Sequence, residues 1–161
     1  MSAFLGRDVT FEVILERDVR PKVNGAYPAP ADTYITVGGR RGASKEATWD
    51  TVDATHALTP GAVRQSLVTF LAISGSLDGV FDNDDAENVT AFEDYVNNPV
   101  GGQPYGWLRI SMPMSDGSTR VEELYCLFTS FSPDFTYDDV TTYTVNYEGQ
   151  QPIIQTTIPA P

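Results

Sequence analysis

The chain has 161 residues, with 22 acidic against 10 basic residues and a formal net charge of −12. This length suits one domain with its own hydrophobic core, and the acidic excess argues against binding to nucleic acid or to anionic membranes. The single cysteine, Cys126, excludes an intrachain disulfide and a cysteine-rich zinc site. The first residues lack a signal-peptide pattern and no apolar run is long enough to span a membrane, so we expect a protein made in the cytoplasm.

The first part of the chain predicts two strands separated by a proline-rich segment. Residues 8–17 alternate between apolar and polar side chains, as a half-buried strand does. Residues 33–39 form a short run of β-favouring residues that ends in two glycines. Residues 18–32 contain three prolines, which excludes a central strand because proline has no backbone N–H. We interpret that segment as a loop or a meandering edge.

Residues 40–66 are polar and unperiodic, which predicts a long loop without regular structure. Trp49 and Val52 do not suit a disordered segment, so we expect this loop to become ordered against a partner. The only histidine, His56, lies in the same segment. Catalytic triads need a histidine held beside a nucleophile, and a solvated loop side chain is the simpler interpretation.

The middle of the chain predicts a buried strand followed by the only helix. Residues 67–77 are apolar on both faces, which is typical of a strand buried on both sides. Val89, Phe92 and Val96 then recur at spacings of three and four residues, which predicts a helix over about 85–97.

The acidic residues around this helix invite a calcium interpretation. Asp82, Asp84 and Glu93 fall at the first, third and twelfth positions of an EF-hand loop. Glu87, however, occupies the position where that loop requires glycine. We therefore interpret the acids as capping the helix and expect no metal and no cofactor.

The last third of the chain predicts three more strands. Residues 105–114 and 119–131 are joined by "SDGS", an Asp-Gly turn. Residues 140–149 alternate so that one face carries Tyr143, Val145 and Tyr147 and the other carries Thr142, Thr144 and Asn146. The final residues, 150–161, are apolar and bounded by prolines, and nothing within the domain offers them an obvious packing surface.

The pair Asp138 and Asp139 precedes the last of these strands. Two carboxylates suffice for glycosidase chemistry, but adjacent strand residues point to opposite faces. Aspartate also favours turns, because its side chain bonds the nearby backbone. We therefore interpret the pair as a structural turn and expect no enzymatic activity. The predicted fold is mainly β: an antiparallel β-sandwich or barrel with one flanking α-helix.

Four segments, in this order, resemble the major tail tube protein of long-tailed bacteriophages. They are "FLGRDVTFEV", "ITVGGRRGASKEATWDTVDAT", "ISGSLDGVF" and "LFTSFSPDFTYDDVTTYTVNYEGQQP". The resemblance implies one tail-tube domain over residues 1–161, six copies in a ring, and strands from all copies joined in one barrel around a lumen. Rings stack into the tube through which the genome leaves.

The resemblance also implies roles for segments and partners. Residues 40–66 would contact the neighbouring subunit and ring, and residues 150–161 would act as a C-terminal arm. The partners would be other copies and the tape-measure, tail-terminator and tail-tip proteins, with DNA passing unbound. The protein would reside in the virion tail after assembly in the host cytoplasm.

These implications define two sets of candidate residues. The hypothetical subunit or ring interface comprises Trp49, Asp50, Val52, Asp53, Asp138, Asp139, Ile153 and Ile154. The hypothetical lumen-facing residues are Thr142, Thr144 and Asn146. Two alternatives remain open: another assembly component of the same fold, such as a tail terminator, tail-tip or secretion-tube subunit, and a β-sandwich sugar-binding decoration module, for which Trp107 and Tyr105 are candidate aromatic contacts.

Overall fold

The computed structural model describes residues 9–15, 22–29, 34–36, 40–55, 61, 64, 66–80, 86–98, 102–135 and 141–161. These residues form eight strands and one helix. The elements are β1 (Thr10–Leu15), β2 (Ile35–Thr36), β3 (Arg40–Asp53), β4 (Ser66–Val80), α1 (Ala86–Asn97), β5 (Tyr105–Pro113), β6 (Thr119–Asp134), β7 (Thr142–Gly149) and β8 (Ile154–Ile158). The mainly-β fold with a single helix, predicted from the sequence, is confirmed.

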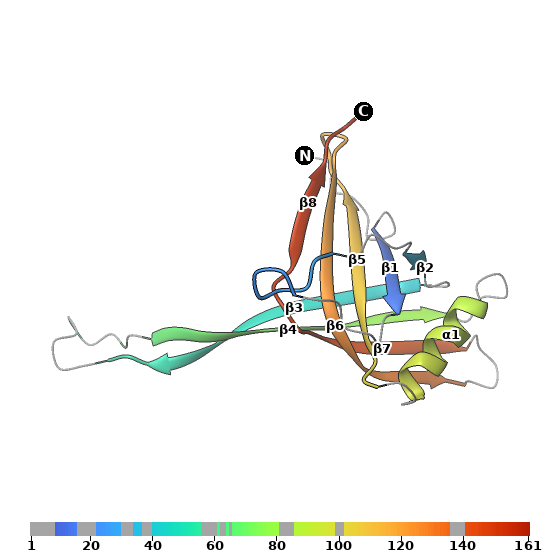
Figure 1. Cartoon of the computed structure of the whole chain (residues 1–161), viewed down its shortest axis with the longest axis horizontal. Helices are drawn as coiled ribbons and strands as arrows, with labels where there is room; N and C mark the ends of the chain where they lie inside the picture. Colours follow the sequence, from blue (N-terminus) through green and yellow to red (C-terminus); the bar gives the residue numbers. More distant parts are fainter. Residues whose placement is uncertain are drawn as a thin grey trace.

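All strands belong to one antiparallel sheet in the order β2-β1-β5-β6-β7-β4-β3, and β8 pairs with β6 beside this path. The long strand β6 belongs to both halves of the sheet. Its first part pairs with β5 and β8, and its second part pairs with β7. Figure 1 shows β5, β8 and the first part of β6 standing upright, whereas β6 then bends to run with β7, β4 and β3 across them.

The core lies between the bent sheet and α1. The helix packs on β6, where the ring of Phe92 contacts Phe128 and Phe131 edge-on at centroid distances of 4.8 and 5.9 Å. Val89 and Phe92 are fully buried, so the spacing that predicted the helix also identifies its core face. The observed bounds, Ala86–Asn97, confirm that prediction.

The turn between β5 and β6 follows the Asp-Gly prediction. Gly117 has a φ of +85°, a backbone conformation that residues other than glycine rarely adopt. The carboxylate of Asp116 accepts a hydrogen bond from the backbone N–H of Ser118 at 2.9 Å. This bond closes the turn. The hydrogen bond from the Ser118 hydroxyl lowers the pKa of Asp116, and the bond from the Ser118 N–H lowers it further.

Three predictions about elements were wrong. Residues 40–53 form strand β3 instead of a loop, because they pair with β4 over most of their length. Both faces of the outer part of β3 are exposed, so its sequence lacks the alternation that one-sided burial produces. Residues 67–77 are not buried throughout, since only Ile73 and Leu77 in this strand lie in the core.

The third error concerns the C-terminal segment. Ile154–Ile158 pairs with Thr119–Glu123 of β6 in the same chain, and Ile153 packs against the core. β7 ends at Gly149, which leaves the neighbouring stretch of the same β6 edge open for β8. The segment therefore has a packing surface within the domain that its own sequence does not reveal.

Two buried groups predict how stability responds to alkaline pH. Burial raises the pKa of the Cys126 thiol and of the Tyr147 hydroxyl above their ordinary values of 9.0 and 10.0, and negative charge on Cys126 and Glu122 adds to the rise at Tyr147. Above about pH 9 the unfolded chain therefore loses protons that the folded chain keeps, so the free energy of unfolding should fall as pH rises. Urea unfolding at about pH 8 and about pH 11 would measure this fall. Cys126→Ala should make it smaller, whereas equal free energies at both pH values in the parent chain would contradict the prediction.

Candidate functional site: a polar sheet face and an exposed apolar arm

Four neighbouring strands, β6, β7, β4 and β3, present one continuous face made of small polar and acidic side chains. Cross-strand pairing places these residues side by side, and we call them the polar face: Ser130, Ser132, Asp134, Thr142, Thr144, Asn146, Glu148, Ser74, Ser76, Asp78, Gly42, Ser44 and Glu46. Four of them are acidic and none is Lys or Arg. The polar face therefore carries only negative formal charge.

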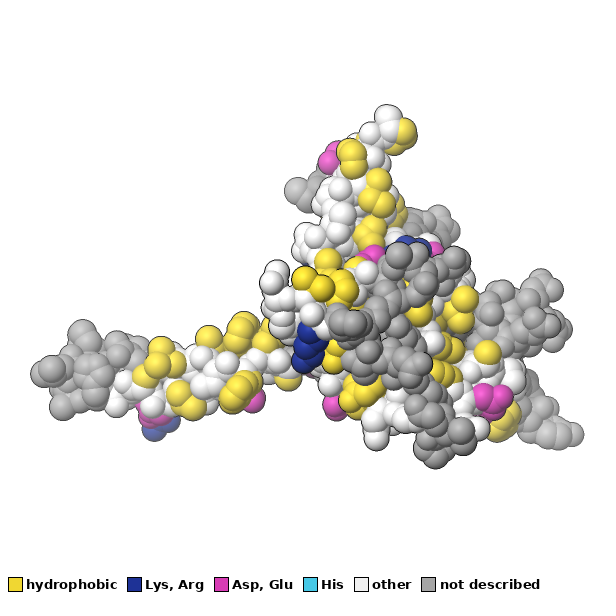
Figure 2. All heavy atoms as spheres, viewed as in Figure 1, with side chains coloured by type: hydrophobic (Ala, Val, Ile, Leu, Met, Phe, Trp, Pro, Cys, Tyr) yellow, Lys and Arg dark blue, Asp and Glu magenta, His cyan; other side chains and the backbone are white. Residues whose placement is uncertain are grey.

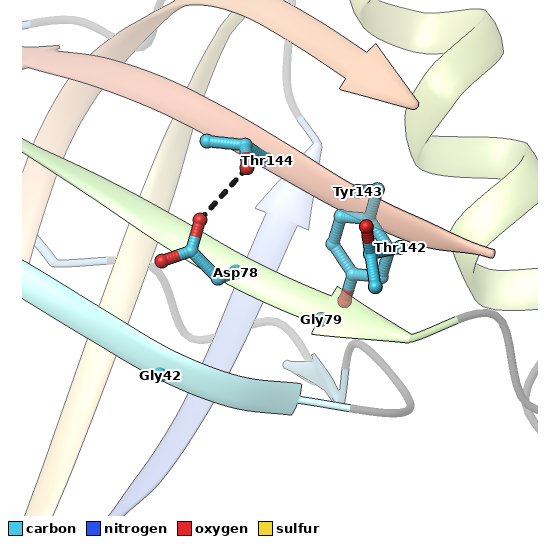
Figure 3. A pocket seen from close by; sticks show the side chains of 6 residues that line it. All are labelled: Gly42, Asp78, Gly79, Thr142, Tyr143 and Thr144. Atoms are coloured by element: carbon cyan, nitrogen blue, oxygen red, sulfur yellow. Dashed lines mark hydrogen bonds between the residues drawn. The ribbon is translucent and has the colours of Figure 1, made fainter. Parts of the chain in front are cut away.

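Side-chain hydrogen bonds run across the strands of the polar face. The hydroxyl of Thr144 donates to Asp78 at 2.8 Å (Figure 3), and the amide of Asn146 donates to the Ser130 hydroxyl at 2.8 Å. The hydroxyls of Ser44 and Ser76 lie 3.0 Å apart on β3 and β4. These bonds orient short side chains on a surface that is otherwise open to water.

The end of this face is hollowed. An open depression of about 350 Å³ is lined by Gly42, Asp78, Gly79, Thr142, Tyr143 and Thr144 (Figure 3). Its lining holds one carboxylate and no cationic side chain. The Asp78 carboxylate in this lining is bonded to the Thr144 hydroxyl of the neighbouring strand, so the depression is part of the hydrogen-bonded polar face.

The opposite side of β7 is anchored in the core. Tyr143, Val145 and Tyr147 are at most 2% exposed. The Tyr147 ring crosses above Gly75 of β4, and its hydroxyl donates to the backbone carbonyl of Ser44 on β3 at 2.9 Å. This anchoring confirms that the three predicted residues Thr142, Thr144 and Asn146 share the face that points away from the core. That they line a channel stays a prediction.

The second candidate region is the outer part of the β3–β4 hairpin, residues 47–53 and 66–72, which we call the hairpin arm. Figure 1 shows it projecting from the body of the molecule, and Figure 2 shows hydrophobic side chains along it. Six of these side chains are exposed: Trp49, Val52, Leu67, Val68, Phe70 and Leu71. Phe70 is the most exposed of the six, at 75%. Large apolar groups gathered on a projection indicate a surface for a partner.

Apolar side chains occupy both faces of the hairpin arm. Trp49 pairs directly with Leu71 on one face, and Val52 pairs with Leu67 on the other. The register shifts between Trp49 and Thr51, where β4 contains one extra residue. Two-sided apolarity explains why residues 67–77 resembled a fully buried strand.

The predicted interface residues fall into separate places. Asp50 and Asp53 lie on the hairpin arm with Trp49 and Val52. The carboxylate of Asp53 accepts a 2.8 Å hydrogen bond from the backbone N–H of Thr55, and hydrogen bonding to Thr55 lowers its pKa. This bond shapes the chain as it leaves β3.

The other predicted interface residues are not on the hairpin arm. Ile153 and Ile154 are half-buried at the start of β8, where the upright part of the sheet begins. Asp138 and Asp139 lie outside the described residues, as does His56. The six candidate interface residues that the structure describes therefore lie in two separate places.

Sequence reasoning missed two groups of residues. Leu67, Val68, Phe70 and Leu71 were assigned to the core, although their two-sided apolar pattern also fits a segment covered by a partner. On the polar face, Ser74, Ser76 and Asp78 alternate with core positions in "ISGSLD", and this period of two could have identified them.

The aromatic residues considered for sugar binding do not form an exposed platform. Trp107 is 1% exposed, and its ring lies 5.4 Å from that of Tyr125. The Tyr105 ring stacks on the Tyr125 ring, with the two centroids 5.6 Å apart. The sugar-binding hypothesis is therefore wrong for Trp107, since a ring buried in the fold cannot stack on a ligand.

Among the described residues, no group of three or more His, Cys, Asp or Glu side chains is placed to hold a metal ion. No helix in this part of the chain has the length and apolar character needed to cross a membrane. The thiol of Cys126 is fully buried, which argues against a reactive role.

No sequence-family model matches the chain, and no curated protein matches it. Solved structures do. A chain in the tail of an empty gene transfer agent (GTA) particle, refined with C6 helical symmetry, is 18% identical with a TM-score of 0.66, over 96% of this chain and 99% of that one. A chain of the SPP1 tail tube is 12% identical, with a TM-score of 0.61 over 98% and 80% of the two chains.

A chain in the six-fold symmetrised baseplate of the anti-feeding prophage (AFP) is 10% identical, with a TM-score of 0.62 over 99% of this chain and 97% of that one. Identities this low carry no residue roles across. Each of the three matches nevertheless covers at least 96% of this chain, so the likeness extends over the whole fold. The chain has the fold found in the tail of the GTA particle and in the SPP1 tail tube.

Proposed function

We propose that this protein is a structural subunit that polymerises as stacked hexameric rings into a viral tail tube. The observation that carries the proposal is the polar face, a four-strand surface without basic residues in a chain with a tail-tube fold. DNA binds proteins mainly through contacts between phosphates and Lys or Arg. A surface that offers only hydroxyl, amide and carboxylate groups suits the wall of a channel along which DNA slides.

The layer of strands that carries the polar face has two open edges through which copies would join. The outer edge of β3 has no neighbouring strand among the described residues. On the other side, β5 pairs with β6 only as far as Leu127, which leaves the edge of β6 beyond that residue without a strand in the described part of the chain. Pairing β3 of one copy with this part of β6 in the next would close six layers into a barrel and remove both edges.

The remaining partners follow from this proposal. The tape-measure protein and later the genome would occupy the channel, while terminator and tail-tip proteins would cover the two ends of the tube. The protein would act in the virion tail after assembly in the host cytoplasm, without an enzymatic step, cofactor or membrane contact. It would form one domain over residues 1–161.

Negative-stain electron microscopy of the concentrated protein tests the proposal directly. We expect tubes built from stacked rings, together with a six-fold signal in end-on views. A protein that stays monomeric under all salt and concentration conditions would contradict the proposed function. The second candidate function is a related assembly component, which the likeness to a baseplate chain supports. Single closed rings without tubes would favour this second function.

The hairpin arm should be needed for assembly but not for folding. The double substitution Trp49→Ser and Phe70→Ser removes apolar side chains that are 50% and 75% exposed. Because exposed substitutions usually change stability by less than about 0.5 kcal/mol, the melting temperature of the monomer should hardly move. Tube formation should be lost, since the arm's apolar surface would no longer be buried against another copy.

Val23→Ser provides a matched control. This side chain is also apolar and 59% exposed, but it lies outside the arm. The control should assemble like the parent chain in light scattering and in micrographs. If the arm variant assembles equally well, the hairpin arm is not an assembly surface.

A further inference from the structure

A buried carboxylate lies where the hairpin arm joins the body. Glu122 of β6 is only 4% exposed, and its two oxygens have different cationic partners. Lys45 of β3 donates to Oε2, and Arg120 donates to Oε1 at 2.8 Å. The same Arg120 nitrogen donates to Gln155 of β8 at 3.0 Å. These four side chains, which we call the junction, connect β3, β6 and β8.

The junction coincides with the root of the arm. β4 pairs with β7 only as far as Ser74, and beyond this point β3 and β4 continue as a two-stranded ribbon. Two-stranded ribbons twist more strongly than larger sheets and have little stability of their own. At the root, β3 is held twice: through the Ser44 carbonyl bonded to Tyr147, and through Lys45 bonded to Glu122.

Stability alone is a weak reason for such an arrangement. Removing charges from water is costly, so a buried ion pair is often no more stabilising than apolar residues of similar size. Its directional bonds do restrict geometry, because they are satisfied only in one arrangement of the strands. In this chain the restricted quantity is the angle between β3, which continues into the arm, and the upright pair β6–β8.

We propose that Glu122 is a positioning residue for assembly: together with Lys45 it holds the hairpin arm at one angle, so that the arm meets the next copy ready to bind. The proposal rests on the proposed function, because it assumes that the arm contacts another copy. Arg120 and Gln155 extend the restraint to β8. An arm that samples many angles would bind in only a fraction of its conformations, and its apparent affinity would fall by that fraction.

The angle of the arm can be measured in the monomer by electron spin resonance. Spin labels at Thr51→Cys on the arm and Ser115→Cys on the β5–β6 turn use two exposed positions. The native Cys126 is buried, and burial raises the pKa of its thiol, so it should remain unlabelled. The doubly labelled chain without other changes should give one narrow distribution of distances between the labels.

Glu122→Gln and Lys45→Met should each broaden this distribution, and the two together should broaden it no further than either alone, because they remove the same link. The separate substitution Lys45→Arg should leave the distribution of distances as narrow as in the parent chain. Glu46→Gln is the matched control, since this exposed carboxylate is adjacent on β3 but outside the junction. If Glu122→Gln fails to fold, Lys45→Met still provides the test, because it leaves the Glu122–Arg120 bond in place.

Assembly provides the second measurement. A variant whose arm adopts the binding angle about one tenth of the time should need about tenfold more protein to form tubes. Variants that melt at lower temperature but keep a narrow distribution would overturn the inference, because the junction would then only stabilise the fold. If the parent chain forms no tubes, the proposed function fails, and the distances in the monomer still decide whether the junction sets the angle of the arm.

Discussion

Replacing Gly75 with alanine should destabilise the subunit by about 3 kcal/mol, at the upper end of what overpacking a core usually costs. A Cβ atom at this position would lie 2.1 Å from the Ser44 carbonyl oxygen and 2.5 Å from the Tyr147 hydroxyl. Neither neighbour can yield easily, because the two are hydrogen-bonded to each other and the Tyr147 ring is buried. β3 must therefore move away from β4, or Tyr147 must leave its position.

Thermal and urea unfolding would measure the effect. For a chain of this length, a loss of about 3 kcal/mol should lower the melting temperature by about 6–12 °C. Gly42→Ala is the matched control on the neighbouring strand, because its nearest atom would be Asp78 Oδ2 at 4.0 Å. The control should change stability by no more than about 0.5 kcal/mol. Equal stabilities of the two variants would show that Tyr147 does not pack over Gly75 as described.

Cysteine labelling should separate the inside of the tube from its outside. Asn146→Cys places a thiol on the exposed polar face, whereas Thr90→Cys places one on the exposed side of α1. These positions lie on opposite sides of the sheet, because α1 packs against the core face through Phe92. In unassembled subunits, both thiols should react with a small maleimide and with one attached to a long polymer.

Assembly should change the outcome at only one position. In intact tubes, Asn146→Cys should still react with the small reagent, but its reaction with the bulky one should be lost except at the tube ends. Thr90→Cys should keep reacting with both. The physical reason is access: a channel admits a small molecule along its length and excludes a large polymer from its wall. Bulky labelling of Asn146→Cys along the whole tube would place the polar face outside and contradict the channel assignment.

Some features of the fold were predictable because they follow from local chemistry. The helix at Ala86–Asn97 follows from the spacing of Val89 and Phe92, and the turn at Gly117 follows from an Asp-Gly pair. The two faces of β7 follow from the strict alternation of large apolar residues, such as Tyr147, with small polar residues, such as Asn146. In each case the signal comes from residues close together in the chain, so it can be recognised in the sequence without knowledge of the tertiary contacts.

Local sequence patterns were therefore enough to predict a mainly antiparallel β chain, the helix at Ala86–Asn97, an acidic balance and a polar side to β7. Three features became visible only in the folded chain: residues 40–53 form a strand, β8 returns to β6, and Glu122 bonds Lys45 at the root of the hairpin arm. These features depend on pairing between residues far apart in the chain. Where both faces of a strand are exposed, or where a partner strand comes from elsewhere, local periodicity carries no information about the pairing.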